Sequence, residues 1–200
     1  MRRLTSQELL WKSNFGDNYI DRNRHDLRLP HWEKILKKIN IHNDFSILEF
    51  GANIGVNLDT IKFLHPDVSL FGIEINKKAY QELSKKHTAF ESSVIDFIAN
   101  RKFELVFTFV FLIHINPNEL EKIYKKLYTL SNRYILIAEY FNPLPVVVEY
   151  RNEKSALFKR DFAGDLLDLY PDLKLIDHGF FWKRDKVCGE DNINWFLFEK

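Results

Sequence analysis

The sequence predicts an α/β fold, with a mostly parallel, Rossmann-like sheet, helices on both faces and an antiparallel hairpin at the C-terminal end. Short apolar runs typical of buried strands alternate with segments whose apolar residues recur at helical spacing. A turn from Gly51 to Gly55 joins the first of these strands to a helix. The last two strand-like runs have no helix between them, so they must pair antiparallel.

Composition and charge are those of an ordinary soluble globular domain. The chain has 200 residues, of which 46% are apolar and 28% charged, which is enough to bury a sizeable core. We expect one domain over residues 1–200, made of a helical cap or lid (1–40) and a Rossmann-like core (41–200). The net charge of +1 gives no support for binding nucleic acid or an anionic membrane.

The N-terminus and the cysteine content indicate the compartment. Two arginines at positions 2 and 3 precede no apolar run of signal-peptide length, and no run is long enough to span a bilayer. The single cysteine, Cys188, excludes an internal disulfide and suits a reducing environment. We therefore expect a cytoplasmic protein; its oligomeric state is left open.

Each element has its own sequence signal. Apolar residues at helical spacing predict a helix from about residue 31, and Asn116 before Pro117 and Glu119 marks the start of another. The segment with Pro143 and Pro145 is expected to be a loop. Strands are expected over 46–50, 68–75, 88–94, 103–113 (continuing into a loop), 134–140, 174–182 and 194–199, and helices near 58–66, 77–86, 117–130 and 162–170.

The glycine turn indicates the kind of ligand. A dinucleotide-binding turn carries three glycines, G-x-G-x-x-G, but here Asn53 stands at the middle position and Gly55 comes one residue early. A bulky middle residue argues against a pyrophosphate on this turn. Glu74 closes the second strand, where a carboxylate can accept from both hydroxyls of a ribose. A ribose without a pyrophosphate suggests a nucleoside such as S-adenosylmethionine, and an NAD oxidoreductase is the alternative.

The stretch Glu49–Gly55 (EFGANIG), the segment Gly72–Ile75 (GIEI) and the closing hairpin resemble the class I S-adenosylmethionine-dependent methyltransferases. Further segments are similar to the pseudaminic acid biosynthesis-associated methylases, in register over nearly the whole chain. These are Trp11, Phe15–Tyr19, Arg22–Asn23, Leu112–Pro117, Ala138–Pro143, Glu149–Arg151, Phe158–Phe162 and Trp195–Lys200. After the third strand this chain has Ser92-Ser93 where the family often has Gly-Ser.

The resemblance implies a set of residues around S-adenosyl-L-methionine and its product S-adenosyl-L-homocysteine. Tyr19 is expected to cover the cofactor, Arg22 to pair with its carboxylate, and Ser93 or Asp96 to reach the adenine. The full expected set is Tyr19, Arg22, Glu49, Gly51, Ala52, Asn53, Gly55, Asn57, Glu74, Ile75, Ser93, Val94, Asp96, Thr108 and Phe109. The alternative is that the glycine turn and the strand ends serve only packing and bind no ligand.

The resemblance also implies an acceptor side. His114, just past the fourth strand, is expected to act as the base or to orient the acceptor, with Tyr140 and Glu139 as alternatives. Tyr150, Arg151, Lys159 and Arg160 follow the fifth strand and are expected to bind a small, anionic, sugar-like acceptor of a nonulosonic acid or nucleotide-sugar pathway. The alternatives are that His114 is a partly buried structural residue and that the residues after the fifth strand belong to a solvated charged surface.

Other functions agree less well with the sequence. A non-catalytic cofactor-binding or scaffold domain would keep the fold without turnover, and methylation of RNA or protein would need a basic or appended binding surface that the sequence lacks. No metal is expected, because the seven histidines and one cysteine show no ligand spacing. Serine-nucleophile and P-loop motifs are also missing.

Overall fold

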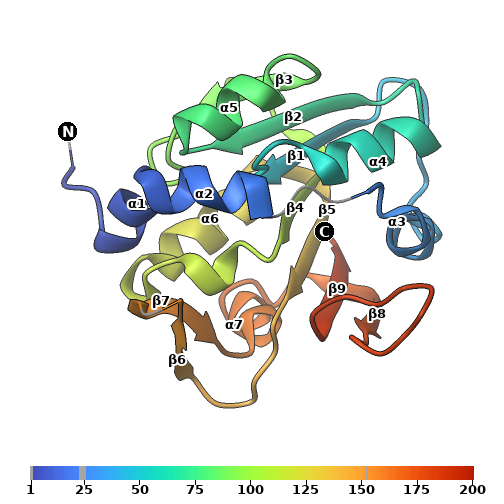
Figure 1. The fold of residues 1–200 in the computed structure, drawn as a ribbon. Coiled ribbons are helices and arrows are strands. Elements are labelled where there is room, and N and C mark those ends of the chain that lie inside the picture. Colours follow the sequence, from blue (N-terminus) through green and yellow to red (C-terminus); the bar gives the residue numbers. More distant parts are fainter. Residues whose placement is uncertain (1, 23–25, 152) are drawn as a thin grey trace.

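The computed structural model describes residues 2–22, 26–151 and 153–200 (Figure 1). Seven strands form one sheet in the order β3-β2-β1-β4-β5-β9-β8. β1 to β5 pair in parallel, whereas β9 pairs antiparallel with both β5 and β8. This is the predicted sheet with its closing antiparallel hairpin.

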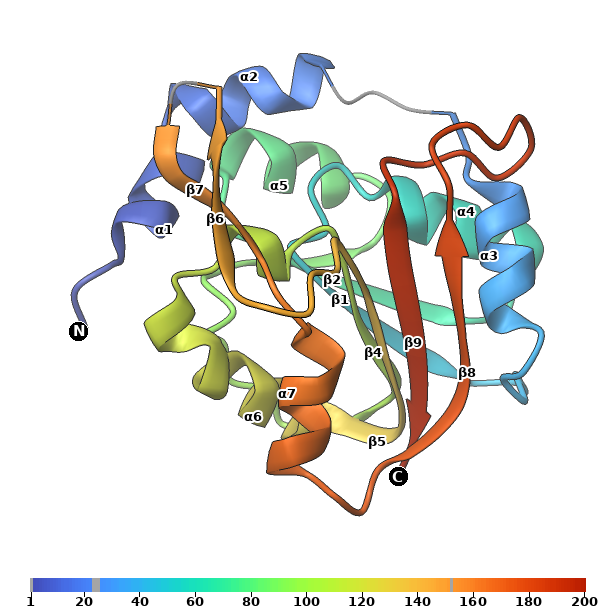
Figure 2. The same ribbon diagram turned by 90° about the horizontal axis from the view of Figure 1, so that it is seen from below.

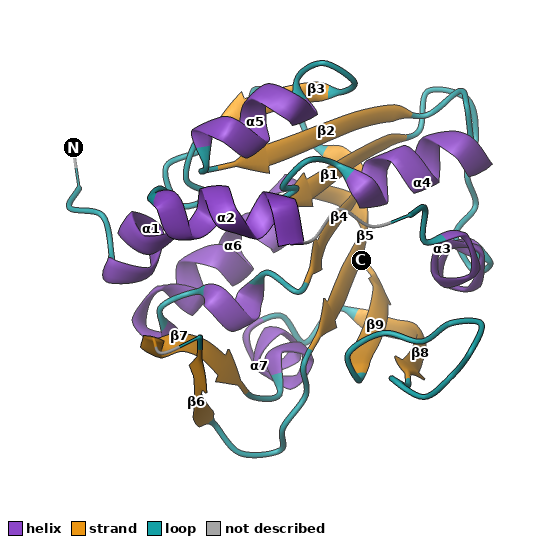
Figure 3. Ribbon diagram, in the orientation of Figure 1, coloured by secondary structure: helices purple, strands orange, loops and turns teal. Residues whose placement is uncertain are grey.

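The strands alternate with helices along the chain, as Figure 3 shows. The main-sheet strands are β1 (Ser46–Phe50), β2 (Ser69–Glu74), β3 (Thr88–Glu91), β4 (Phe103–Phe109), β5 (Ser131–Glu139), β8 (Lys174–Phe181) and β9 (Ile193–Glu199). The helices are α1 (Ser6–Trp11), α2 (Asn14–Arg22), α3 (Leu29–Leu36), α4 (Val56–Leu64), α5 (Lys77–Leu83), α6 (Leu120–Leu130) and α7 (Phe162–Leu169), with short 3-10 turns η1 (Leu112–His114) and η2 (Pro117–Glu119).

Two apolar clusters make the sheet the middle layer of three (Figure 2). On one face α3 and α4 contribute Trp32 and Leu58 to a cluster with Phe107. On the other face α6 and α7 contribute Leu127 and Leu166. Because both faces are covered, the central strands are mostly apolar, and all five residues of β1 are buried, including Ser46 and Glu49.

One prediction of the sequence analysis was wrong, because residues 146–159 form a second sheet instead of a loop. β6 (Val146–Tyr150) and β7 (Glu153–Lys159) pair antiparallel. Pro143 and Pro145 lie just before β6, so they do not interrupt it, and the β-branched run that follows suits a strand. In the sequence the two prolines indicated a loop, although the strand begins only after them.

Some boundaries also differ from those expected. β3 ends at Glu91 instead of Val94, because Val94 turns inward to join the core on the α6 side. β5 begins at Ser131, directly after α6, because the Leu130–Ser131 junction passes from helix to strand without a loop. No helix among the described residues has the length and apolar character needed to cross a membrane.

Candidate functional site

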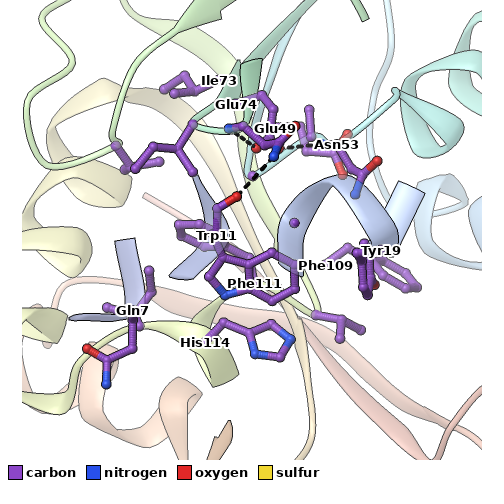
Figure 4. Close-up of a pocket in the computed structure, with 18 of the residues that line it drawn as sticks. Gln7, Trp11, Tyr19, Glu49, Asn53, Ile73, Glu74, Phe109, Phe111 and His114 are labelled. Carbon is purple, nitrogen blue, oxygen red and sulfur yellow. Dashed lines mark hydrogen bonds between the residues drawn. The ribbon is translucent and has the colours of Figure 1, made fainter. Parts of the chain in front are cut away.

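A cavity of about 230 Å³ lies at the carboxyl ends of β1, β2 and β4. The chain reverses its direction of winding between β1 and β4, and ligands of open α/β sheets bind at such a point. α1 and α2 add Trp11, Gly16 and Tyr19 to the lining (Figure 4). The predicted residues that line the cavity are Tyr19, Glu49, Gly51, Ala52, Asn53, Asn57, Glu74, Ile75, Ser93, Val94, Phe109, His114 and Tyr140.

The glycine turn is shaped by two left-handed residues. Gly51 has φ +68°, and a Cβ there would lie 2.2 Å from Cδ2 of the Phe111 ring. Gly55 has φ +87° and caps the N-terminus of α4, where a Cβ would lie 2.7 Å from Leu83. Both positions therefore require glycine. Gly51 lines the cavity, whereas Gly55 shapes the turn and does not line the cavity.

Glu74 ties the end of β2 to the glycine turn. One carboxylate oxygen accepts from the backbone N–H of Asn53 at 2.8 Å, and the other from that of Asn76 at 2.7 Å. Burial raises the pKa of this carboxyl, and the backbone N–H groups oppose the increase. Each oxygen can accept a second hydrogen bond, and the side chain lines the cavity. The predicted position of Glu74 at the end of the second strand is confirmed.

Glu49 presents a buried oxygen without a partner. Its Oε1 accepts from Nδ2 of Asn57 at 2.7 Å, while its Oε2 has no hydrogen-bond partner among the described residues. The side-chain oxygen of Asn57 accepts from Trp32 Nε1 at 3.2 Å and from Arg28 Nη1 at 3.1 Å, which fixes the amide orientation. Arg28 is itself paired with Glu190 at 3.1 Å. A buried carboxyl group that lines a cavity in this way suits a cationic ligand group.

We expect the burial of Glu49 to make the free energy of unfolding depend on pH. Burial raises the pKa of Glu49 to about 8 from an ordinary 4.5, so folding favours the protonated carboxyl. Its contribution is therefore complete below about pH 4.5 and is lost as the pH rises through about 8. Glu49→Gln keeps an uncharged side chain at every pH. In urea unfolding of the unliganded protein, the variant should gain stability relative to the wild type as the pH rises; a difference independent of pH would contradict the assignment.

The N-terminal segment closes the end of the cavity that Ser93 lines. Ser93 lines the cavity, donates its hydroxyl hydrogen to Glu8, and accepts from Arg2 Nη2 at 2.9 Å. Arg2 also pairs with Glu8 and donates from Nε to Asp96 at 2.9 Å. Asp96 is exposed and does not line the cavity. Of the two residues predicted to reach the adenine, Ser93 lines the cavity and Asp96 does not, and both side chains contact Arg2.

α1 and α2 are held over the cavity by polar and aromatic contacts. Asn76 Nδ2 donates to the Trp11 carbonyl at 3.0 Å and to Asp17 at 2.8 Å. The rings of Trp11 and Tyr19 meet edge to face at 5.1 Å. Burial raises the pKa of Tyr19 to about 12, so its hydroxyl stays neutral. Arg22 ends α2, but its side chain lies outside the part of the chain that the structure describes.

His114 lies at the end of η1, opposite Glu49 and Glu74 (Figure 4). Its ring centroid is 4.6 Å from that of Trp11 and 5.7 Å from that of Tyr150. Thr108 is fully buried in β4 and does not line the cavity, whereas Phe109 does. The two sides of the cavity are therefore different: one is carboxylate-rich, and the other is aromatic with a histidine.

The residues predicted after the fifth strand are placed unevenly. Tyr140 lines the cavity, and Lys159 Nζ lies 5.0 Å from the centre of its ring. Similarly, the Cζ atom of the exposed Arg151 lies 5.5 Å from the centre of the Tyr150 ring. Arg160 forms an ion pair with Asp165 at 2.5 Å, on the side of α7. Glu139 is buried behind η1 and does not line the cavity.

Several lining residues were not predicted as site residues, among them Gln7, Glu8, Trp11, Arg28, Asn76, Phe111 and Glu190. The sequence Thr5–Glu8 does carry a capping-box signal, and the structure forms that box at the start of α1. The contact of Glu8 with Ser93 has no such local signal. No cluster of three or more metal-ligating side chains occurs in residues 2–22, 26–151 and 153–200.

No protein-family model matches the sequence, and no curated protein matches it. Solved structures do match. The 1,6-didemethyltoxoflavin-N1-methyltransferase of Burkholderia thailandensis, solved with bound 1,6-didemethyltoxoflavin and S-adenosylhomocysteine, is 13% identical over 100% of this chain and 92% of that chain, with a TM-score of 0.72. The magnesium protoporphyrin IX methyltransferase of Synechocystis PCC 6803, with bound S-adenosylmethionine, is 12% identical over 100% of both chains, with a TM-score of 0.67.

A third structure, an S-adenosylmethionine-dependent methyltransferase of Clostridium acetobutylicum, is 11% identical over 93% of this chain and 97% of that chain, with a TM-score of 0.64. At these identities the similarity speaks for the fold. The chain has the Rossmann-like fold of the S-adenosylmethionine-dependent methyltransferases.

Proposed function

We propose that this protein is an S-adenosylmethionine-dependent methyltransferase that acts on a small acceptor. The observation that carries the proposal is the position of Gly51, Glu74 and Glu49 around one cavity, at the ligand-binding edge of a methyltransferase fold. Solved proteins of this fold hold S-adenosylmethionine or S-adenosylhomocysteine.

The residues present fit the cofactor part by part. Glu74 keeps acceptor capacity for two ribose hydroxyls. Gly51 lines the cavity beside it, and the absence of a side chain there lets the Phe111 ring lie against the turn. Oε2 of Glu49, which has no hydrogen-bond partner within the described part of the chain, suits the ammonium group of the methionine part. Ser93 and Val94 line the end that would take the adenine.

When bound, the cofactor supplies a methyl group on a sulfonium, which is already a good leaving group. The chain then has to align the acceptor and exclude water. Trp11 and Tyr19 provide the cover. His114 stands on the side away from Glu49 and Glu74, where it can take a proton from an acceptor hydroxyl or orient the acceptor.

The acceptor that we propose is small, anionic and sugar-like, and is methylated on oxygen or nitrogen in the cytoplasm. Lys159 and Arg151 support this, because they lie over the rings of Tyr140 and Tyr150 beside the aromatic side of the cavity. Arg160 does not, because Asp165 already neutralises it. The resemblance to the pseudaminic acid-associated methylases favours a nonulosonic acid or its nucleotide-activated form.

The test is incubation with labelled cofactor and a panel of sugars, nucleotide sugars, tRNA and peptides, followed by mass spectrometry. We expect one methyl group to be gained by an anionic sugar or nucleotide sugar. Label found only in tRNA or peptides would contradict the small acceptor, and cofactor binding without transfer to any acceptor would favour a scaffold role.

If an anionic acceptor is found, Lys159→Ala should raise its KM by about 10-fold or more, the scale of one charge-assisted hydrogen bond. Lys174→Ala, at an exposed lysine of β8, is the matched control and should leave KM unchanged. Equal values for the wild type and both variants would show that Lys159 is solvated and does not bind the acceptor.

A further inference from the structure

The turn that carries His114 is attached to the end of β5 by a single side chain. Oε1 of Glu139 accepts from the backbone N–H groups of Phe111 and Leu112, both at 3.0 Å. Oε2 accepts from the N–H of Ile113 at 3.4 Å. Three successive amides of the turn thus point at one buried carboxylate, which is 3% exposed.

The backbone of this turn does not follow from its own sequence preference. Val110 has φ +54°, a left-handed conformation that a β-branched residue rarely adopts. Its N–H donates to the Ala138 carbonyl at 2.8 Å, so the strained residue is also joined to β5. Strain of this kind persists only where surrounding contacts fix the conformation, and the Glu139 carboxylate supplies three of them.

The turn places two side chains on the cavity. The ring of Phe111 lies against Gly51, and the ring of His114 lies 4.6 Å from that of Trp11. A shift of the turn would therefore move the aromatic side of the cavity relative to the glycine turn. Because methyl transfer needs in-line alignment, a displacement of about 1 Å can cost up to about 100-fold in rate.

We propose that Glu139 is a positioning residue that acts through His114. It makes no contact with the cavity, and its carboxylate fixes the Phe111–Ile113 amides so that the His114 ring faces the acceptor. The consequence for turnover rests on the proposed methyltransferase function, whereas the consequence for the His114 ring does not. A carboxylate suits this role because it only accepts hydrogen bonds; the amide of a glutamine would direct N–H donors at N–H donors.

The test combines kinetics with NMR of the histidine ring. Glu139→Gln should lower kcat by about 10- to 100-fold with nearly unchanged cofactor affinity, and should add little to the loss caused by His114→Ala, because both remove the same function. The His114 ring resonances should shift in Glu139→Gln. Ser131→Ala removes a buried hydrogen bond at the other end of β5 and should change neither kcat nor these resonances.

Two results would overturn the proposal: unchanged kcat and unchanged His114 resonances in a folded Glu139→Gln protein, or losses that multiply in the double variant. Should Glu139→Gln not fold, Glu139→Asp keeps the charge but shortens the reach by one methylene, and the same results apply. A protein without methyl transfer in any form would refute the proposed function. The NMR comparison would then still decide whether Glu139 positions His114.

Discussion

Replacing His114 with alanine is expected to slow methyl transfer by about 10²- to 10⁴-fold, the usual loss when a general base is removed. Affinity for the cofactor should be nearly unchanged, because His114 lies on the aromatic side of the cavity, away from Glu49 and Glu74 (Figure 4). Single-turnover kinetics with saturating cofactor would measure the loss directly, and calorimetry would check the affinity.

His178→Ala is the matched control, because His178 is an exposed histidine of β8 that stacks on Phe196 and does not line the cavity. It should transfer methyl groups at the wild-type rate. A His114→Ala protein that also works at full speed would show that His114 is structural. The acceptor would then be an amine that is already deprotonated, or Tyr140, the predicted alternative that lines the cavity, would be the base.

Replacing Glu74 with alanine is expected to weaken cofactor binding by about 1.5–3 kcal/mol, the scale of hydrogen bonds to a charged group. This corresponds to a rise in Kd of about 10- to 150-fold. The variant loses the ribose acceptors and also frees the amides of Asn53 and Asn76, which the carboxylate holds at 2.8 and 2.7 Å. Both effects act on the cofactor side, so Kd should change in the same direction.

Glu91→Ala provides the control for this variant. Glu91 ends β3 and is the register partner of Glu74 in the neighbouring strand, but it is exposed and does not line the cavity. Its removal should leave Kd unchanged. If Glu74→Ala binds the cofactor as tightly as Glu91→Ala does, Glu74 does not contact the ribose.

The glycine-turn side of the cavity could be predicted because its signals are local. Gly51 is required by a positive φ next to a strand end, and Glu74 closes the next strand in sequence. Their positions follow from the parallel order of β1 and β2, which the alternation of strands and helices already implies. Such a site depends on few long-range contacts.

The Ser93 end of the cavity and the side of His114 could not be predicted to the same depth. The contact of Glu8 with Ser93 joins residues 85 positions apart, and the partners of Glu139 are backbone amides, which carry no side-chain signal. Arg160 looked like Lys159 in the sequence, but only the fold shows that Asp165 neutralises it. Charge patterns identify candidate cations, whereas the ion pairs that cancel them depend on tertiary structure.

The proposed function requires that the cavity at the carboxyl ends of β1, β2 and β4 binds S-adenosylmethionine. Isothermal titration of the wild-type protein with S-adenosylmethionine and with S-adenosylhomocysteine tests it most directly. We expect both to bind at one site per chain, and Glu74→Ala to weaken both. No binding of either compound at millimolar concentration would contradict the assignment, and NAD would be the next ligand to titrate.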